Sequence, residues 1–208
     1  MKKLIIMMIA LVPLTLWAQD NTWEQPEEEQ EAEVAEKPAK VNPDQKYLRG
    51  AVPVVDGKVV FSTHITAPGK KAAEVYAICK NYIEKMLKQS NQINSSIITD
   101  DADRHLTTAV FEEWLVFKKT FIAYDRTRFK YALEVISQDG AADIRISHIR
   151  YTYDEERDAQ HYTAEEWITD KEAVNKKNTK LLPLSGKFRR KTIDRKDFLF
   201  NKFQSLLQ

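Results

Sequence analysis

The stretch RFKYALEVISQDGAADIRISHIRYTY, residues 128–153, decides the fold. In its first half, large nonpolar residues occupy every second position and alternate with charged or small ones. This is the pattern of a β-strand with one buried face and one wet face. The predicted buried set is Phe129, Tyr131, Leu133 and Val135. Asp139-Gly140 then predicts a tight hairpin turn into the next strand.

That next strand changes phase part-way along. Ile144 and Ile146 share one parity, whereas the nonpolar residues from Ile149 onward share the other. One extra residue in a strand shifts the alternation by one position and defines a β-bulge. The sequence therefore predicts a bulge near Ser147 or His148.

Upstream of this stretch, a second hairpin and a helix are expected. Asp56-Gly57 lies between two short β-branched runs within residues 52–61, which is a strong hairpin signal. Between residues 70 and 88, nonpolar residues recur at the spacing of one helix face, with Cys79 in the middle of that face. We therefore expect Cys79 to be buried and unreactive.

The remaining elements complete an α+β pattern. Strands are expected at 97–99 and 107–117, and a C-terminal amphipathic helix at 194–207. Thr163 with Glu166, and Thr169 with Glu172, have the spacing of helix-capping boxes. A strand, a helix, a meander of strands and closing helices predict an antiparallel sheet with helices packed on one side.

The first 18 residues have the features of a secretory signal peptide. Lys2 and Lys3 precede a nonpolar run of about 13 residues, and the small residue Ala18 follows. A helix that spans a bilayer needs about 20 residues, so this run is too short for a permanent anchor. We expect cleavage near Ala18, export to the periplasm or cell envelope, and no transmembrane segment in the mature chain. No cysteine lies near Ala18, so no lipid-anchored form is expected.

Residues 19–46 predict an acidic, disordered linker, and residues 47–208 a single domain. The linker has nine acidic residues and three lysines, whereas the domain has 27 Lys and Arg against 22 Asp and Glu. Prolines and the scarcity of nonpolar residues favour disorder in the linker. We expect the linker to act as a spacer. Its net negative charge leaves open that it folds back on the basic domain.

Three phrases of the chain resemble a family of exported bacterial proteins, the domain of unknown function 4468. They are YLRGAVPVVDGKVVF (47–61), AEEWITDK (164–171) and GKFRRKTID (186–194). The resemblance covers nearly all of 47–208 and implies a fold similar to that of the TATA-binding protein. It implies no activity and no catalytic residues. DNA binding is not expected, because a fold does not fix a function and an exported protein does not meet the genome.

The most unusual local feature of the domain is a basic cluster near its C-terminus. It comprises Lys187, Arg189, Arg190 and Lys191, followed by Arg195 and Lys196. Such a cluster would attract phosphate, an acidic glycan or lipid headgroups by charge. The alternative is a solvated loop and helix start. We take Lys187, Arg189, Arg190 and Lys191 as the candidate sites for an anion or a partner.

No motif in the chain predicts a metal, a cofactor or a reaction. Asp100, Asp101 and Asp103 do not have the spacing of a calcium loop, and a turn is expected there. The four histidines are scattered, and five glycines in all leave little room for a phosphate-binding loop. No catalytic, cofactor-binding or metal-binding residue is therefore assigned.

Aromatic residues offer a further candidate surface for a sugar or a peptide. The residues are Trp114, Trp167, Tyr151, Tyr153 and Tyr162. Core packing explains most of them equally well.

Three functional hypotheses follow. The leading one is a non-enzymatic envelope protein that binds another protein or an anionic surface component, without nucleic acid. The second is a small-molecule-binding or hydrolase-type enzyme with a dispersed site, beginning with His148 and nearby acids. The third is a structural domain of an envelope assembly, which would show an exposed nonpolar patch or an unpaired sheet edge.

Overall fold

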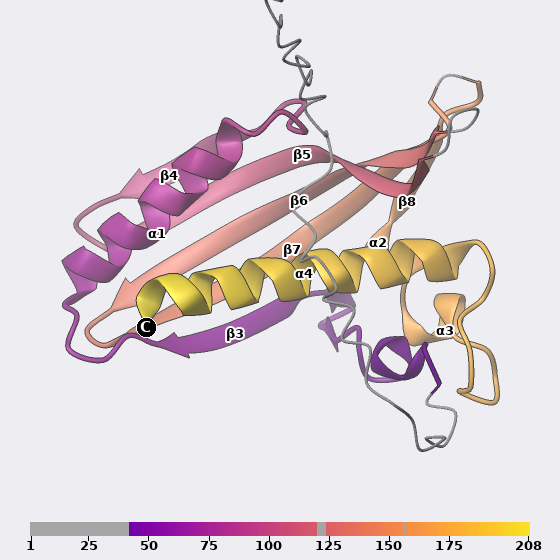
Figure 1. Cartoon of the computed structure of the whole chain (residues 1–208), viewed down its shortest axis with the longest axis horizontal. Coiled ribbons are helices and arrows are strands. Elements are labelled where there is room, and N and C mark those ends of the chain that lie inside the picture. The colour runs from indigo at the N-terminus through magenta and orange to yellow at the C-terminus, as the bar shows by residue number, and fades with distance from the viewer. Residues whose placement is uncertain (1–41, 120–123, 156) are drawn as a thin grey trace, which may run out of the picture.

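Long antiparallel strands dominate the architecture in the computed structural model, which describes residues 42–119, 124–155 and 157–208 (Figure 1). The sheet order is β3-β7-β6-β5-β4, and β8 also pairs with β7. The strands are β3 (Phe61–Thr66), β4 (Ser96–Asp101), β5 (Leu106–Lys119), β6 (Tyr124–Gln138), β7 (Ala141–Tyr153) and β8 (Gln160–Thr163). The predicted antiparallel α+β fold is confirmed.

Helices lie on one face of this sheet (Figure 1). They are α1 (Ala72–Leu87), α2 (Ala164–Trp167), α3 (Asp170–Ala173) and α4 (Ser185–Leu207). A short 3₁₀ helix, Gln45–Tyr47, and a small hairpin of β1 (Val54–Val55) and β2 (Lys58–Val59) precede them. Asp139 in the β6–β7 turn accepts a hydrogen bond of 2.8 Å from the backbone nitrogen of Ala72 and so caps the start of α1.

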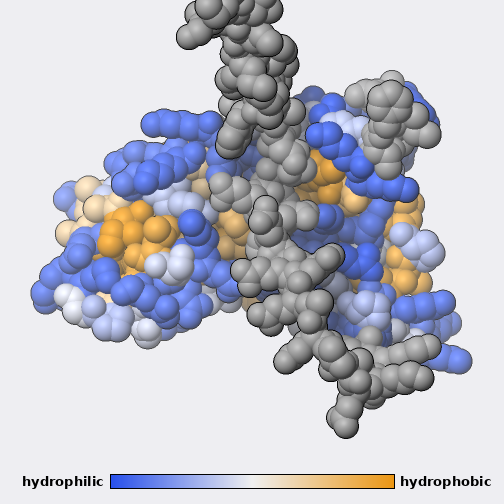
Figure 2. All heavy atoms as spheres, viewed as in Figure 1, coloured by the Kyte–Doolittle hydropathy of each residue, from blue (hydrophilic) through white to orange (hydrophobic). Residues whose placement is uncertain are grey.

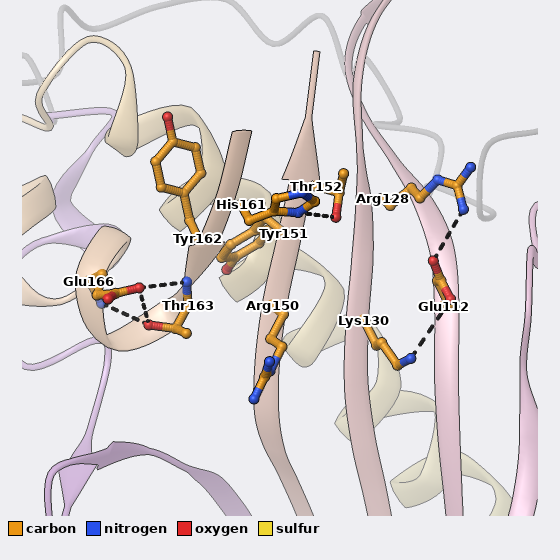
Figure 3. Close-up of a pocket in the computed structure, with 10 residues that line it drawn as sticks. All are labelled: Glu112, Arg128, Lys130, Arg150, Tyr151, Thr152, His161, Tyr162, Thr163 and Glu166. Carbon is orange, nitrogen blue, oxygen red and sulfur yellow. Dashed lines mark hydrogen bonds and ion pairs between the residues drawn. The ribbon is translucent and has the colours of Figure 1, made fainter. Parts of the chain in front are cut away.

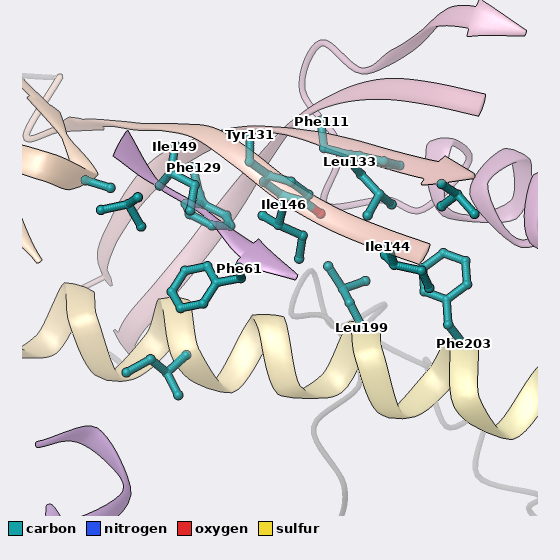
Figure 4. Packing of buried hydrophobic residues seen from close by; sticks show 14 of the residues in the cluster. Phe61, Phe111, Phe129, Tyr131, Leu133, Ile144, Ile146, Ile149, Leu199 and Phe203 are labelled. Carbon is teal, nitrogen blue, oxygen red and sulfur yellow. The ribbon is translucent and has the colours of Figure 1, made fainter. Parts of the chain in front are cut away.

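The core lies between the sheet and the two long helices (Figure 4). The odd-numbered residues from Phe129 to Val135 on β6 are buried, as their alternation predicts. Leu199 and Phe203 of α4 pack against them from the helix side. In the view of Figure 2, the hydrophobic residues that reach the surface lie in separate areas among hydrophilic ones. Most large nonpolar side chains of the described residues are therefore buried inside the domain.

A buried charged network joins α4 to the sheet inside this core. Arg195 on α4 donates to both carboxylate oxygens of Glu113 on β5, at 2.7 and 2.8 Å. Each of these residues is only 1% exposed. Tyr131, Asn91 and Gln92 donate further hydrogen bonds to the same carboxylate. Every strong acceptor position of Glu113 is thus occupied, which is what a buried charge requires.

The two predicted hairpins and the predicted helix are confirmed. β1 pairs with β2 across Asp56-Gly57, and β6 pairs with β7 across Asp139-Gly140. Cys79 is buried on the inner face of α1, and burial raises the pKa of its thiol to about 12. The segments expected to be a signal peptide and a linker lie, as far as residue 41, outside the described residues.

The expected start of the C-terminal helix at residue 194 is wrong, since α4 begins at Ser185. Arg189 and Arg195 occupy buried positions on the inner face of α4. Charged residues at these positions interrupt the nonpolar periodicity that would have revealed the helix. The close approach of Gly186 to Leu181 marks its true beginning, because a Cβ added at Gly186 would lie 2.6 Å from the Cβ of Leu181.

Two smaller expectations also need correction. The capping box of Thr163 and Glu166 is present at α2, but Thr169 makes no side-chain cap at α3. Its hydroxyl instead donates to the backbone oxygen of Glu165 at 3.4 Å. The ordered domain also begins before the expected boundary of 47, because Asp44 already accepts a hydrogen bond of 3.2 Å from the backbone nitrogen of Leu181.

Candidate functional site

The predicted β-bulge on β7 creates the most distinctive surface of the molecule. His148 and Ile149 lie in the register shift where Arg150 pairs with Lys130 and Ser147 pairs with Ala132. His148 has φ of 55°, a conformation that a bulge of this kind normally assigns to glycine. The extra residue brings Ser147, His148 and Arg150 to the face of the sheet opposite the helices. We call this surface the helix-free face.

Three open depressions meet at this bulge. The first, of about 320 Å³, lies over β5, β6, β7 and β8. The second, of about 420 Å³, lies over β4 to β7, and the third, of about 580 Å³, lies between β7 and the β1–β2 hairpin. Arg150 lines all three. Figure 3 shows the first, with Arg150 between the β8 residues and Lys130.

The register explains why the sheet is hollow here. Val110, Ala132 and Ser147 stand next to one another on β5, β6 and β7. These short side chains form one cross-strand row, and longer ones flank it on both sides. A neighbouring row runs through Glu112, Lys130, Arg150 and Thr163. Rows on one face of a sheet are about 7 Å apart along the strand, so the short row forms the floor and the longer residues form the walls.

The charges on the helix-free face are mostly paired. Arg128 forms ion pairs with Glu155 and, at 3.4 Å, with Glu112. The hydrogen bond from Arg128 to Glu155 raises the pKa of the guanidinium. Lys130 lies 3.9 Å from Glu112, and Arg145 lies 3.6 Å from Glu134.

Glu166 contributes a carboxylate at the rim of the first depression. The side chain and backbone of Thr163 donate hydrogen bonds to it and lower its pKa. Glu166 therefore stays ionised while it serves the capping box of α2.

Among the described residues, Lys58 at the third depression and Arg150 are exceptions. The side chain of Arg150 is exposed, and among the described residues it has no hydrogen bond or ion pair. Its cross-strand neighbour is the cation Lys130. Like charges directly opposite each other destabilise a sheet. An anion placed over Arg150 would offset this repulsion.

The basic cluster predicted near the C-terminus does not form a shared surface. Its members lie on successive positions of α4 and point in different directions. Lys187 pairs with Asp125 at 2.8 Å, and Arg190 pairs with Asp44. Lys191 is half-buried and, within the described part of the chain, has no ionic partner.

Arg189 is an internal structural residue. It is 0% exposed. Its guanidinium donates to the backbone oxygens of Tyr47, Leu48 and Ile168, and forms an ion pair with Asp170 at 2.6 Å. Burial lowers its pKa, although the ion pair opposes this shift. The expectation that Arg189 binds an external anion is therefore wrong, because all its donors hold the chain around residues 47–48 and 168–170.

The aromatic residues divide between two places. Tyr151, Tyr153, Tyr162 and Trp167 all surround Phe188 on α4, at ring centroid distances from 5.2 to 6.3 Å. Their rings pack around Phe188, although Tyr151 and Tyr162 also line part of the first depression. Trp114 lies on the helix-free face, where the guanidinium of Arg126 stacks 3.6 Å from its ring centre. The five residues therefore form no single platform.

The acidic stretch and His148 can also be placed. Asp100 accepts hydrogen bonds from Tyr76 and Lys80, and Asp101 accepts one from the backbone of Arg104 in the turn that follows β4. His148 contacts the hydroxyl of Ser147 at 3.0 Å, and no carboxylate among the described residues bonds to it. The described residues hold no group of three or more potential metal ligands.

Comparison with solved structures identifies the family. The chain is 40% identical to a DUF4468 family protein from Bacteroides ovatus ATCC 8483, with a TM-score of 0.73, and the match covers 79% of this chain and 94% of that one. This chain belongs to the DUF4468 family. The family model, a domain of unknown function with TBP-like fold, matches residues 61–152. The bulge and Arg150 lie within that range, and the resemblance seen in the sequence is confirmed.

A second solved structure supports the fold of this DUF4468 chain. It is a TBP-like protein from Parabacteroides distasonis ATCC 8503, 21% identical, with a TM-score of 0.62 and coverage of 76% of this chain and 97% of that one. Among curated proteins, none matches this chain. The family indicates no function, so any function must be argued from the site itself.

Sequence reasoning missed Arg150, Lys130 and Arg145 as candidates. The alternation of β6 and β7 correctly assigns them to the wet side of the sheet. No signal in the alternation says that this side lacks a covering layer, or that a row of short side chains crosses it. Pairing register, which a single sequence does not give, brings Val110, Ala132 and Ser147 together.

Proposed function

We propose that this chain is a non-enzymatic, exported envelope protein that binds another protein through the helix-free face. The observation that carries the proposal is Arg150, an exposed cation without an ionic partner among the described residues, at the point where three depressions meet. Arginine presents a rigid fork of donors that suits a carboxylate.

The balance of charge favours a protein over a polyanionic surface. The cations that line the three depressions are Lys58, Arg128, Lys130, Arg145 and Arg150. The carboxylates that line them are Asp56, Glu112, Glu134, Glu165 and Glu166. Nucleic acid, an acidic glycan or an anionic membrane would meet five negative side chains here. A protein surface of mixed charge can instead match both signs.

The enzymatic alternative has less support. A serine or histidine nucleophile system needs a base that a third group orients. Ser147 and His148 are in contact, but no carboxylate of the described residues holds the second nitrogen of His148. The first depression holds Glu112, Glu166 and His161, but each already has a partner. Glu112 pairs with Arg128, Glu166 accepts from Thr163, and His161 lies 3.1 Å from the hydroxyl of Thr152.

The structural alternative is weakened by the shape of the sheet edge. β4 is an outer strand, but its pairing with β5 shifts register between Ile97 and Thr99. Bulges and short strands at an edge are devices that oppose strand addition. In the described part of the chain, no helix is both long enough and apolar enough to pass through a bilayer.

The proposal is tested with the mature chain immobilised and exposed to an envelope extract of its native cell. Arg150→Glu is compared with Arg104→Glu, which changes an exposed arginine in the β4–β5 turn, outside the three depressions. A protein retained by the native chain and by Arg104→Glu, but lost by Arg150→Glu, supports the proposal. Retention of nothing by the native chain contradicts it.

Two further measurements separate the alternatives. Flotation with anionic lipid vesicles that depends on Arg150 would replace the protein partner with a membrane surface. Export is checked by N-terminal sequencing of the chain from its native cell. A start near Gln19 is expected, whereas intact residues 1–18 would rule out the signal peptide.

A further inference from the structure

The second depression differs from the other two in the chemistry of its lining. Ile98, Val110 and Ala132 contribute nonpolar surface to it. Ile98 is 61% exposed and lies at the register shift of β4, where it has no cross-strand partner. Ile136 on β6 is 37% exposed, two positions beyond Glu134 on the same face. Single exposed nonpolar residues are ordinary, but Ile98 lines this depression.

This nonpolar depression is continuous with the cationic row. Lys130 and Arg150 line its border and also line the first depression. A ligand over this region would therefore meet an unpaired guanidinium and a nonpolar hollow together. The volume of the second depression, about 420 Å³, is within the range of clefts that hold small ligands or side chains.

From these contacts, and on the basis of the proposed function, we infer that the helix-free face binds an extended peptide segment of its partner. An Asp or Glu of the segment pairs with Arg150, and an aliphatic side chain of the same segment fills the hollow at Ile98, Val110 and Ala132. Charge complementarity selects this occupant, because Arg150 is the one cation bordering the nonpolar depression that forms no ion pair among the described residues, whereas Lys130 and Arg145 each lie near a glutamate. A single carboxylate meets that need without confronting the neighbouring acids.

The spacing of the two anchors follows from the sheet. Arg150 is on β7 and Val110, in the middle of the hollow, is on β5, two strand spacings away and one cross-strand row along. Strands are about 4.8 Å apart and rows about 7 Å apart, so the separation is about 12 Å. An extended peptide rises about 3.3 Å per residue, and side chains an even number of residues apart point to the same side. The acidic and aliphatic residues should therefore be about four positions apart.

The inference is tested with a random linear peptide library displayed on phage and selected on the immobilised mature chain. Enriched sequences should contain an acidic residue and an aliphatic residue about four positions apart. A synthetic peptide from this set should lose at least about tenfold in affinity when its acid is changed to the amide, since removing one partner of a desolvated charge pair weakens binding strongly.

Reciprocal variants make the test specific to the site. On Arg150→Glu the amide change should no longer weaken binding, and a peptide with lysine in place of the acid should regain binding. Ile98→Asp should abolish the aliphatic preference and keep the acidic one, while Arg104→Glu should resemble the native chain. Thermal unfolding of each variant shows that it remains folded.

Several results would overturn the inference. Enriched peptides without an acid, or equal binding to Arg150→Glu, would show that Arg150 does not select a carboxylate. If no peptide is enriched while an envelope protein is still captured through Arg150, the partner binds by a folded surface. The inference then fails and the proposed function stands. If the envelope capture also fails, the proposed function fails with it.

Discussion

Replacing the buried carboxylate Glu113 with glutamine should destabilise the domain severely. Glu113 accepts two hydrogen bonds from Arg195 and three from Asn91, Gln92 and Tyr131. Glutamine has nearly the same shape but no charge, so Arg195 would remain buried without compensation. Breaking a buried ion pair in this way costs about 3–5 kcal/mol. That is a large share of the roughly 5–15 kcal/mol that stabilises a typical domain.

The assay is urea unfolding followed by circular dichroism. With a slope of about 2 kcal/mol per molar urea, a loss of about 4 kcal/mol moves the midpoint down by about 2 M. Glu134→Gln is the matched control, because Glu134 lies on the helix-free face and its ion pair with Arg145 is 3.6 Å long and partly exposed. This control should cost less than about 1 kcal/mol.

A double variant separates the cost of an unpaired buried charge from the cost of lost packing. Glu113→Leu with Arg195→Met removes both charges together, and hydrophobic replacement of a whole buried pair is often neutral or stabilising. The double variant should therefore be more stable than Glu113→Gln. A cost below about 1 kcal/mol for Glu113→Gln, against the expected 3–5 kcal/mol, would refute the view that the pair is dry and mutually dependent.

Four further outcomes are expected. Arg150→Gln should leave stability unchanged or raise it by up to about 1 kcal/mol in thermal unfolding, because it removes the like-charge contact with Lys130; a clear loss would make Arg150 a structural residue. Gly186→Ala should cost about 1–3 kcal/mol through the 2.6 Å approach to Leu181, and the gain expected from helix propensity alone would contradict this. Cys79 should resist a thiol reagent at pH 8 until urea unfolds the chain, and because burial raises its pKa from 9.0 to about 12, its contribution should lower stability only as pH rises through that interval. Thr163→Ala should cost about 1 kcal/mol and Thr169→Ala less, since only Thr163 caps a helix with its side chain.

The sequence predicts the sheet well because strand alternation and turn type depend on residues that are close together in the chain. Alternation on β6, the turn at Asp139-Gly140 and the phase change near His148 each depend on a few neighbouring residues. All three appear in the structure at the expected places. The bulge is the most useful of these predictions, because the candidate site is built on it.

The start of α4 could not be predicted for a physical reason. Arg189 and Arg195 are charged, so a sequence pattern assigns them to the surface. Both are nearly inaccessible to solvent, because backbone oxygens and Asp170 surround Arg189, and Glu113 lies against Arg195. These partners come from 19 to 142 residues away. Burial of a charge depends on such distant partners, and a local pattern contains no information about them.

Two unfavourable local features coincide on the helix-free face, and neither is needed by the core. His148 adopts φ of 55°, a conformation that costs a residue with a side chain about 1–2 kcal/mol. The like charges of Arg150 and Lys130 lie opposite each other on neighbouring strands, and this also lowers the stability of the sheet. A glycine at 148 and a neutral residue at 150 would keep the bulge and remove both costs. Unfavourable backbone conformations and unfavourable charge pairs of this kind occur mainly at functional sites. The coincidence of both features with the meeting point of three depressions is the strongest physical reason to seek the ligand of this domain at Arg150.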